Sequence, residues 1–241
     1  MLAEREWTMA GRERARARRL ITVIAAVAAA GVVTGLNVPS AVAAQPATLI
    51  PAAATTPAGE GAVIGSQADQ LNGVACRSAR DCLAVGADYH TGTPLAESWN
   101  GTRWRAVSVT LPAGASAALL DGVACPAATG TYCVVVGVVI KGSTAEALAE
   151  TWNGKAWTPI LPAASAGSHL SAVSCPSPVS CVTVGSGGNT EAGSIGYAEA
   201  WNGKTWALTS AVPWPKGTTD PWLYGVSCQA VGHCVAVGLN D

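Results

Sequence analysis

The segment LAESWNGTRW, residues 95–104, returns as LAETWNGKAW at 148–157 and as YAEAWNGKTW at 197–206. Two further motifs precede each copy: a Leu-x-x-Val-Ala/Ser-Cys segment and, after a short loop, a Cys-x-x-Val-Gly segment. Both occur a fourth time, as LYGVSC at 223–228 and CVAVG at 234–238. The first cysteines of the four copies are 49, 50 and 53 residues apart. Such a sustained period indicates a repeat architecture.

Each complete copy predicts four short strands. The Leu-x-x-Val-x-Cys segment is apolar at alternate positions, and the segment at the second cysteine is β-branched, as in Cys181-Val182-Thr183-Val184. The Ala-Glu-x-Trp segment predicts a third strand, and the second Trp begins a fourth. Four strands in a period near fifty are typical of a β-propeller blade. We therefore predict an all-β protein of β-propeller type, with three full blades and half of a fourth.

An Asn-Gly pair separates the third and fourth predicted strands of each complete copy. Asn-Gly between strand residues favours a two-residue hairpin turn, because both turn residues must adopt positive φ. Such a turn at 100–101 would pair Trp99 with Thr102 and Glu97 with Trp104. Trp99 and Trp104 would then be diagonal neighbours on one face of the hairpin.

Over residues 71–241, the alternation of V-[AS]-C, C-x-x-V-G and A-E-x-W-N-G-x-x-W resembles the repeats of secreted β-propeller-like proteins of actinobacteria. The Ala-rich composition and the arginines near the N-terminus fit a high-GC bacterium. The resemblance implies a fold and export, and it implies no particular activity. A closed propeller needs at least about four blades. We therefore expect a truncated sequence, with pairing to another chain or an open arrangement as alternatives.

The N-terminal 44 residues predict a secretory signal peptide. Residues 1–19 hold six of the fourteen Lys and Arg, an apolar run follows at 20–36, and small residues end the segment at 41–44. We expect cleavage after Ala44, with Ala43 as the second choice. An uncleaved membrane anchor is the alternative, and it is disfavoured because the run is short for a spanning helix. The membrane would then be contacted only through this segment.

The remaining chain divides by composition and period. Residues 45–70 are rich in Ala, Pro, Thr and Gly, which predicts a linker. The repeats occupy four ranges, the last of them partial: 71–119, 120–169, 170–222 and 223–241.

Charge excludes some partners. The 241-residue chain is 12% charged, and without residues 1–44 it keeps eight basic and twelve acidic residues, a net charge of −4. Nucleic acid and anionic membrane surfaces attract basic proteins, so we expect neither as a partner.

The eight cysteines form one closely spaced pair in each repeat. In an exported protein such pairs are expected to be oxidised. The spacings lack the two-residue gap of zinc hairpins and no His recurs beside them, so we expect no metal site. The predicted disulfides are Cys76–Cys82, Cys125–Cys133, Cys175–Cys181 and Cys228–Cys234.

Residues that recur at the same place in every repeat usually have a structural role in it, whereas catalysis needs a cluster of residues with different roles. The recurring acids Glu97, Glu150 and Glu199 could suggest a glycosidase. We favour carboxylates that accept structural hydrogen bonds from the backbone or a Trp indole. The three histidines, at 90, 169 and 233, occupy unrelated repeat positions and complete no catalytic triad. No phosphate-binding or cofactor motif is present, so we expect no cofactor.

Two tryptophans lie outside the repeat pattern, in a Pro-rich connection. Trp214 and Trp222 are candidate ligand contacts, because Trp on a loop suits a sugar ring or a partner surface. The alternative is that they cover the edge of the third blade.

These observations favour a secreted, non-catalytic binding or scaffold module whose partner is an envelope protein or a glycan. The alternatives are an extracellular glycan-active hydrolase or lectin, and a truncated fragment of a larger propeller protein. The hydrolase would require unlike acids to converge in one pocket. The candidate acids are Asp88, Glu146, Glu191 and Asp220.

Overall fold

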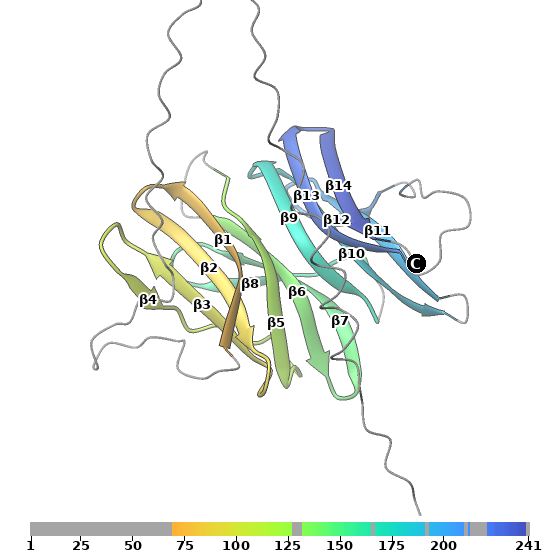
Figure 1. The fold of residues 1–241 in the computed structure, drawn as a ribbon, viewed down its shortest axis with the longest axis horizontal. Helices are drawn as coiled ribbons and strands as arrows, with labels where there is room; N and C mark the ends of the chain where they lie inside the picture. The colour runs from red at the N-terminus through yellow and green to blue at the C-terminus, as the bar shows by residue number, and fades with distance from the viewer. Residues whose placement is uncertain are drawn as a thin grey trace, which may run out of the picture. The chain divides into compact units, whose positions relative to one another are not determined.

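The computed structural model describes residues 69–126, 132–164, 167–190, 193–209, 212 and 221–239 (Figure 1). The predicted signal peptide and nearly all of the predicted linker lie outside these residues, as do Trp214, Glu191 and Asp220. No helix in the described part of the chain is long and apolar enough to cross a membrane.

The described strands form four antiparallel sheets in which consecutive strands are neighbours (Figure 1). Three sheets have four strands each, and the last sheet has two. The strands are β1 (Asp69–Ser78), β2 (Asp81–Asp88), β3 (Thr93–Trp99), β4 (Trp104–Ala106), β5 (Ala117–Ala124), β6 (Cys133–Lys141), β7 (Thr144–Trp152), β8 (Trp157–Ile160), β9 (His169–Ser177), β10 (Ser180–Thr190), β11 (Gly193–Trp201), β12 (Trp206–Leu208), β13 (Trp222–Ala230) and β14 (His233–Leu239).

This architecture confirms the predicted all-β fold of β-propeller type, with three four-stranded blades and half of a fourth. The sheets in the described part of the chain are not closed into a ring. The first strand of each sheet contacts the first strand of the next, from β1 to β5, β9 and β13. We call these four the inner strands.

Strand β6 holds the blades together, because both of its faces are buried. Val134 and Val136 pack into the core shared with the third blade, whereas Val135 and Val139 pack into the core shared with the first. Each fully buried Val contributes about 1.5–3 kcal/mol relative to an exposed one. Two-sided burial explains why this segment is a continuous β-branched run rather than an alternating one.

The hairpin between the third and fourth strands differs from the predicted two-residue turn. Trp99 lies directly opposite Trp104, so the loop has four residues and the predicted pairing was wrong. The Asn100 Oδ1 accepts hydrogen bonds from the amides of Thr102 and Arg103, both at 3.0 Å. This Asx turn accompanies the backbone hydrogen bond from the Asn100 amide to the Arg103 carbonyl at 3.3 Å, and Gly101 has a positive φ of 93°.

The other two hairpins repeat this turn. Asn153 and Asn202 also accept two backbone amide hydrogen bonds each. The two Trp rings of each hairpin consequently lie side by side, with centroids 5.6, 4.9 and 5.5 Å apart in the three blades.

All four predicted disulfides are present and no cysteine is free. Cys76 lies opposite Cys82 in the β1–β2 register, and Cys228 lies opposite Cys234 in β13–β14. Each bridge therefore joins the first two strands of one blade, with Cys125 lying directly after the end of β5. Four disulfides indicate that the protein resides in an oxidising compartment, such as the cell exterior.

Every inner strand carries a β-bulge one residue after its motif leucine. In β1 the register passes from Leu71 opposite Gly86 to Gly73 opposite Val85, which leaves Asn72 as the extra residue. A bulge inserts one unpaired residue and turns its side chain in a new direction. The extra residues of the other inner strands are Asp121, Ser171 and Tyr224.

The glycine of the Cys-x-x-Val-Gly motif makes room for the bulge. A Cβ atom added to Gly86 would lie 1.8 Å from the carbonyl oxygen of Gln70 on the inner strand. The matching distances at Gly137, Gly185 and Gly238 are 2.0, 1.9 and 1.9 Å. Because backbone lies in the way, no residue with a side chain fits there without separating the two strands.

Replacing one of these glycines should therefore destabilise the protein strongly. We expect Gly137→Ala to lower the free energy of unfolding by about 3 kcal/mol or more, measured by urea unfolding of the oxidised chain. Gly142→Ala is the control, since its added Cβ has open space and only its φ of 61° is unfavourable, at about 1 kcal/mol. Equal losses in the two variants would contradict this explanation.

Candidate binding site on the inner strands

The bulges bring four different side chains to equivalent places on neighbouring strands. The backbone is the same in every blade, but the extra residue is an amide in β1, a carboxylate in β5, a hydroxyl in β9 and a phenol in β13. Three of them, Asn72, Asp121 and Tyr224, form with their neighbours a row that we call the inner-strand cluster, whereas the hydroxyl of Ser171 is buried without a hydrogen-bond partner. The cluster consists of Asn72, Tyr89, Asp121, His169, Trp222 and Tyr224.

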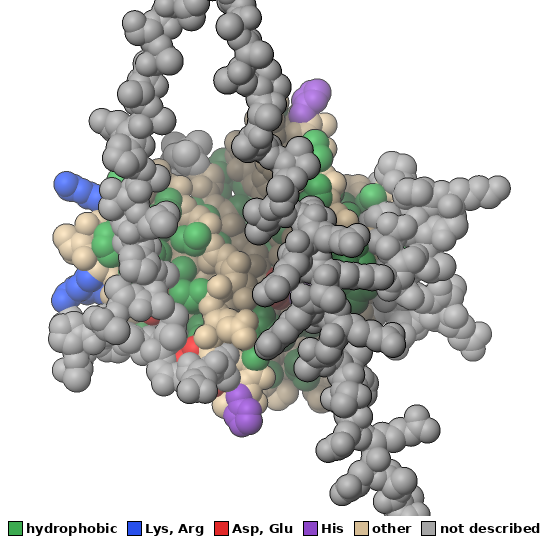
Figure 2. All heavy atoms as spheres, viewed as in Figure 1, with side chains coloured by type: hydrophobic (Ala, Val, Ile, Leu, Met, Phe, Trp, Pro, Cys, Tyr) green, Lys and Arg blue, Asp and Glu red, His purple; other side chains and the backbone are tan. Residues whose placement is uncertain are grey.

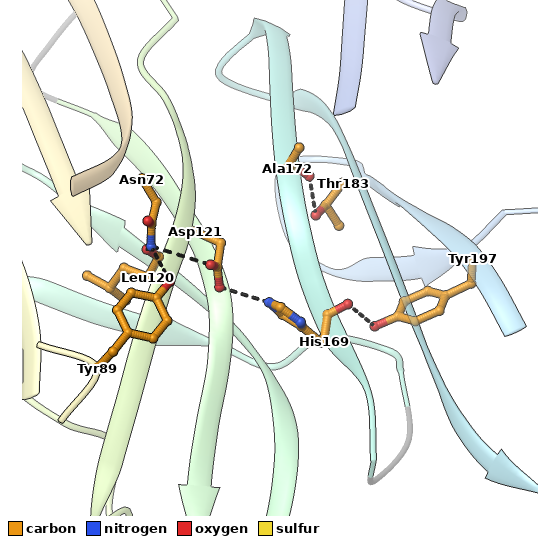
Figure 3. Close-up of polar contacts among 8 residues, drawn as sticks. All are labelled: Asn72, Tyr89, Leu120, Asp121, His169, Ala172, Thr183 and Tyr197. Carbon is orange, nitrogen blue, oxygen red and sulfur yellow. Dashed lines mark hydrogen bonds and ion pairs between the residues drawn. The ribbon is translucent and has the colours of Figure 1, made fainter. Parts of the chain in front are cut away.

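Hydrogen bonds connect the first and second blades at one end of the cluster (Figure 3). The Asn72 Nδ2 donates to the Tyr89 hydroxyl at 2.8 Å and to the Leu120 carbonyl at 2.9 Å. It also lies 3.5 Å from Oδ1 of Asp121. Asn72 is therefore fixed by its contacts with the neighbouring blade, although its side chain is exposed.

A hydrogen bond connects the second and third blades. Oδ2 of Asp121 lies 2.8 Å from Nε2 of His169, and Figure 3 shows the two side chains pointing toward each other across β5 and β9. The Asp121 side chain is 18% exposed and the His169 side chain is 32% exposed. Both groups are thus held in fixed orientations while part of each stays accessible.

Aromatic contacts extend the row to the fourth blade. The Trp222 ring meets the His169 ring edge-on, with centroids 6.5 Å apart. The Trp222 ring also stacks on Tyr224, with centroids 6.2 Å apart and an interplanar angle of 27°. Tyr224 is 53% exposed. This end of the cluster offers a partly exposed aromatic surface beside the polar groups.

The cluster contains no Lys or Arg. On the described surface visible in Figure 2, the Lys and Arg side chains lie at the edge beside β4. The single full negative charge of the row, on Asp121, is paired with His169. The cluster therefore presents hydrogen-bonding groups and aromatic rings with little net charge.

Sequence reasoning found part of this cluster. Trp222 was singled out and lies in the row, but it is the first residue of β13 and not part of a loop. Its contact with a ligand stays a prediction, and Trp214 lies outside the described residues. Asn72, Asp121 and Tyr224 were missed, because a variable position inside a repeat motif was treated as unimportant. That variability, against an otherwise constant motif, was the available signal.

The recurring glutamates are buried rather than assembled into a catalytic site. Glu199 accepts hydrogen bonds at 2.8 Å from the backbone amides of Ala163 and Ala164, in the loop that follows the preceding blade. Burial raises the pKa of Glu199, and these two amides oppose the rise. Glu199 thus has the structural role expected for this repeat position.

Glu150 occupies the same repeat position but has no such partners. It is completely buried, and neither of its carboxylate oxygens has a hydrogen-bond partner. The matching loop of the first blade instead folds on itself, with the Ala115 amide donating to the Pro112 carbonyl at 3.0 Å. Burial raises the pKa of Glu150 to about 7. The expectation of a hydrogen-bonded carboxylate was therefore wrong at this position.

The acids proposed for a hydrolase are engaged locally where they are described. Asp88 accepts hydrogen bonds from the amides of His90 and Thr91, and Glu146 pairs with Lys141 at 2.9 Å. Glu146 lines a cavity of about 210 Å³, in which it is the single acid among the described lining residues. Asp88 and Glu146 thus do not converge in this cavity, as the hydrolase would require.

Comparison with known proteins gives no family. No protein-family model and no curated protein matches the chain. The solved structure described as "YCF48 bound to D1 peptide" is 13% identical with a TM-score of 0.42, over 67% of this chain and 59% of that one. A fucose lectin from Kordia zhangzhouensis in complex with methyl-fucoside is 10% identical with a TM-score of 0.39, over 58% and 99%. The chain thus spans about three fifths of the first of these proteins.

The contrast between Glu150 and Glu199 predicts a pH dependence of stability. The pKa of Glu150 is about 7 in the folded protein and about 4.5 when unfolded. The folded state therefore keeps a proton that the unfolded chain releases, and stability falls as the pH rises from about 4.5 to 7. Glu150→Gln should remove this loss and raise the free energy of unfolding at pH 8 by about 3 kcal/mol relative to the native chain.

The test is urea unfolding of native and variant chains at pH 5 and pH 8. Glu199→Gln is the matched control. Its gain in the free energy of unfolding at pH 8 should be clearly smaller, because a glutamine side chain has only one acceptor oxygen for the two backbone N–H groups that Glu199 binds. A native chain and a Glu150→Gln variant of equal stability at pH 8 would disprove the assignment.

Proposed function

We propose that this protein is a non-catalytic binding module of the cell exterior, which recognises an envelope protein or glycan at the inner-strand cluster. One observation carries the proposal: the four bulges repeat in backbone but differ in side chain. A purely structural position would be expected to keep one residue type across the blades. Three of the four side chains, those of Asn72, Asp121 and Tyr224, instead belong to one asymmetric row over four strands.

The chemistry of the cluster favours binding over catalysis. The imidazole of His169 faces Asp121 through Nε2, and no serine or threonine hydroxyl is hydrogen-bonded to either group in the described part of the chain. All eight cysteines are in disulfides, so no thiol can act as a nucleophile. Groups that are fixed by one another, yet partly exposed, provide the preorganisation that recognition requires.

Export from the cell is the second part of the proposal. The disulfides support an oxidising location, and the N-terminal Arg-rich and apolar segments support secretion, in the manner of an actinobacterial protein. Loops of a propeller-type fold are accessible at its ends, where a partner of the envelope can reach them.

The proposal is tested by sedimentation of the purified, oxidised chain with envelope fragments of the bacterium that exports it. We expect the native chain to be retained and Asp121→Ala to bind at least tenfold more weakly, because His169 and Asn72 lose their shared partner. Asp81→Ala is the matched control: it also removes one aspartate with a side-chain partner, Arg77, but outside the cluster. It should bind like the native chain.

Two results would overturn the proposal. If the envelope fragments do not retain the native chain, the protein is not a binding module of this kind. If Asp121→Ala and Asp81→Ala bind as tightly as the native chain, the binding surface lies elsewhere. Circular dichroism and the midpoint of thermal unfolding establish that each variant is folded before its affinity is compared.

A further inference from the structure

The inner-strand cluster combines two kinds of surface that are suited to a single class of ligand. One is the stacked pair Trp222 and Tyr224, whose rings can pack against the C–H face of a ring-shaped, partly apolar molecule. The other is the row Asn72, Asp121 and His169, whose planar groups are held by one another. The His169–Trp222 contact at 6.5 Å joins the two surfaces, so that one ligand can touch both.

The polar groups are suited to hydroxyls. The carboxylate of Asp121 accepts hydrogen bonds, the Oδ1 of Asn72 also accepts because its Nδ2 already donates to Tyr89 and Leu120, and the His169 ring offers a second nitrogen beyond the one facing Asp121. A vicinal pair of hydroxyls can donate to one such group and accept from its neighbour. Groups held in place lose little conformational entropy on binding, which favours recognition by few contacts.

Charge in the cluster argues against ionic ligands. An anionic ligand, such as a phosphate or a uronic acid, would find no Lys or Arg in the row and would face the Asp121 carboxylate. A cationic ligand would have to compete with His169, which lies 2.8 Å from that carboxylate. A neutral ligand meets neither difficulty.

The inner strands also resist pairing with an extended peptide. Strand addition needs a regular row of free N–H and C=O groups, and every inner strand is interrupted by its bulge. Neighbouring blades already use part of the free edges: Asn72 donates to the Leu120 carbonyl, and the Cys228 amide donates to the Ser174 hydroxyl at 3.0 Å.

We infer that the inner-strand cluster binds a neutral pyranose residue of an envelope glycan, with the sugar ring packed on Trp222 and Tyr224 and its hydroxyls bonded to Asp121, Asn72 and His169. This inference rests on the binding function proposed above and specifies the chemistry of its ligand.

Its first test uses the same envelope fragments after two separate treatments. Periodate cleaves vicinal diols of sugars, whereas a proteinase removes protein. We expect periodate to reduce retention of the native chain at least tenfold and proteinase to leave it unchanged. Loss of retention after proteinase and not after periodate would overturn the sugar assignment while leaving the binding function in place. Absence of retention by untreated envelopes would overturn both.

The second test is competition with methyl pyranosides of neutral hexoses and N-acetylhexosamines, each at millimolar concentration. At least one should release the native chain from the envelope, whereas glycerol at the same concentration should not. Tyr224→Ser should weaken retention at least tenfold. Leu208→Ser is the matched control, since Leu208 is 56% exposed on β12, outside the cluster, and loses a similar apolar surface. Release by no pyranoside, or equal retention of the two variants, would overturn the inference.

Discussion

The close approach of a carbonyl oxygen to a glycine Cα in each blade determines much of this structure. The missing side chain at Gly86, and at its three counterparts, lets the inner strand bulge toward its neighbour. The bulge in turn directs Asn72 of the first blade and Asp121 of the second toward the adjacent inner strand. The same close approach thus explains why a glycine recurs in every copy of the repeat. It also explains where the variable bulge residues, which include Asn72 and Asp121 of the candidate site, are placed.

Much of the fold could be predicted from the sequence, because the repeat displays each local rule several times. The strand order, the number of blades and the cysteine pairing follow from motifs at a period near fifty residues. The hairpin turn could not be predicted, because Asn-Gly is compatible with two turn geometries. The side-chain oxygen of Asn100, bonded to two backbone amides, decides between them.

The candidate site was harder to predict, because it depends on contacts between blades. Asp121 and His169 are 48 residues apart and belong to different copies, so no local motif contains both. Trp222 was singled out because it lies outside the repeat pattern in a Pro-rich connection, yet its partners Tyr224 and His169 emerge only from the arrangement of the inner strands. The same limitation applies to Glu150 and Glu199, which share a motif and differ in the loop that each one meets.

The disulfides have a consequence for survival outside the cell. Each bridge joins two cysteines that are six or eight positions apart in the sequence, around the turn between the first two strands of a blade. A protease that cuts the backbone between two such cysteines, for example in the turn near Arg80, leaves both ends covalently joined. No fragment would be released, and the two strands would keep their pairing. The turns between the first two strands of the blades are thus places at which a single cleavage does little damage.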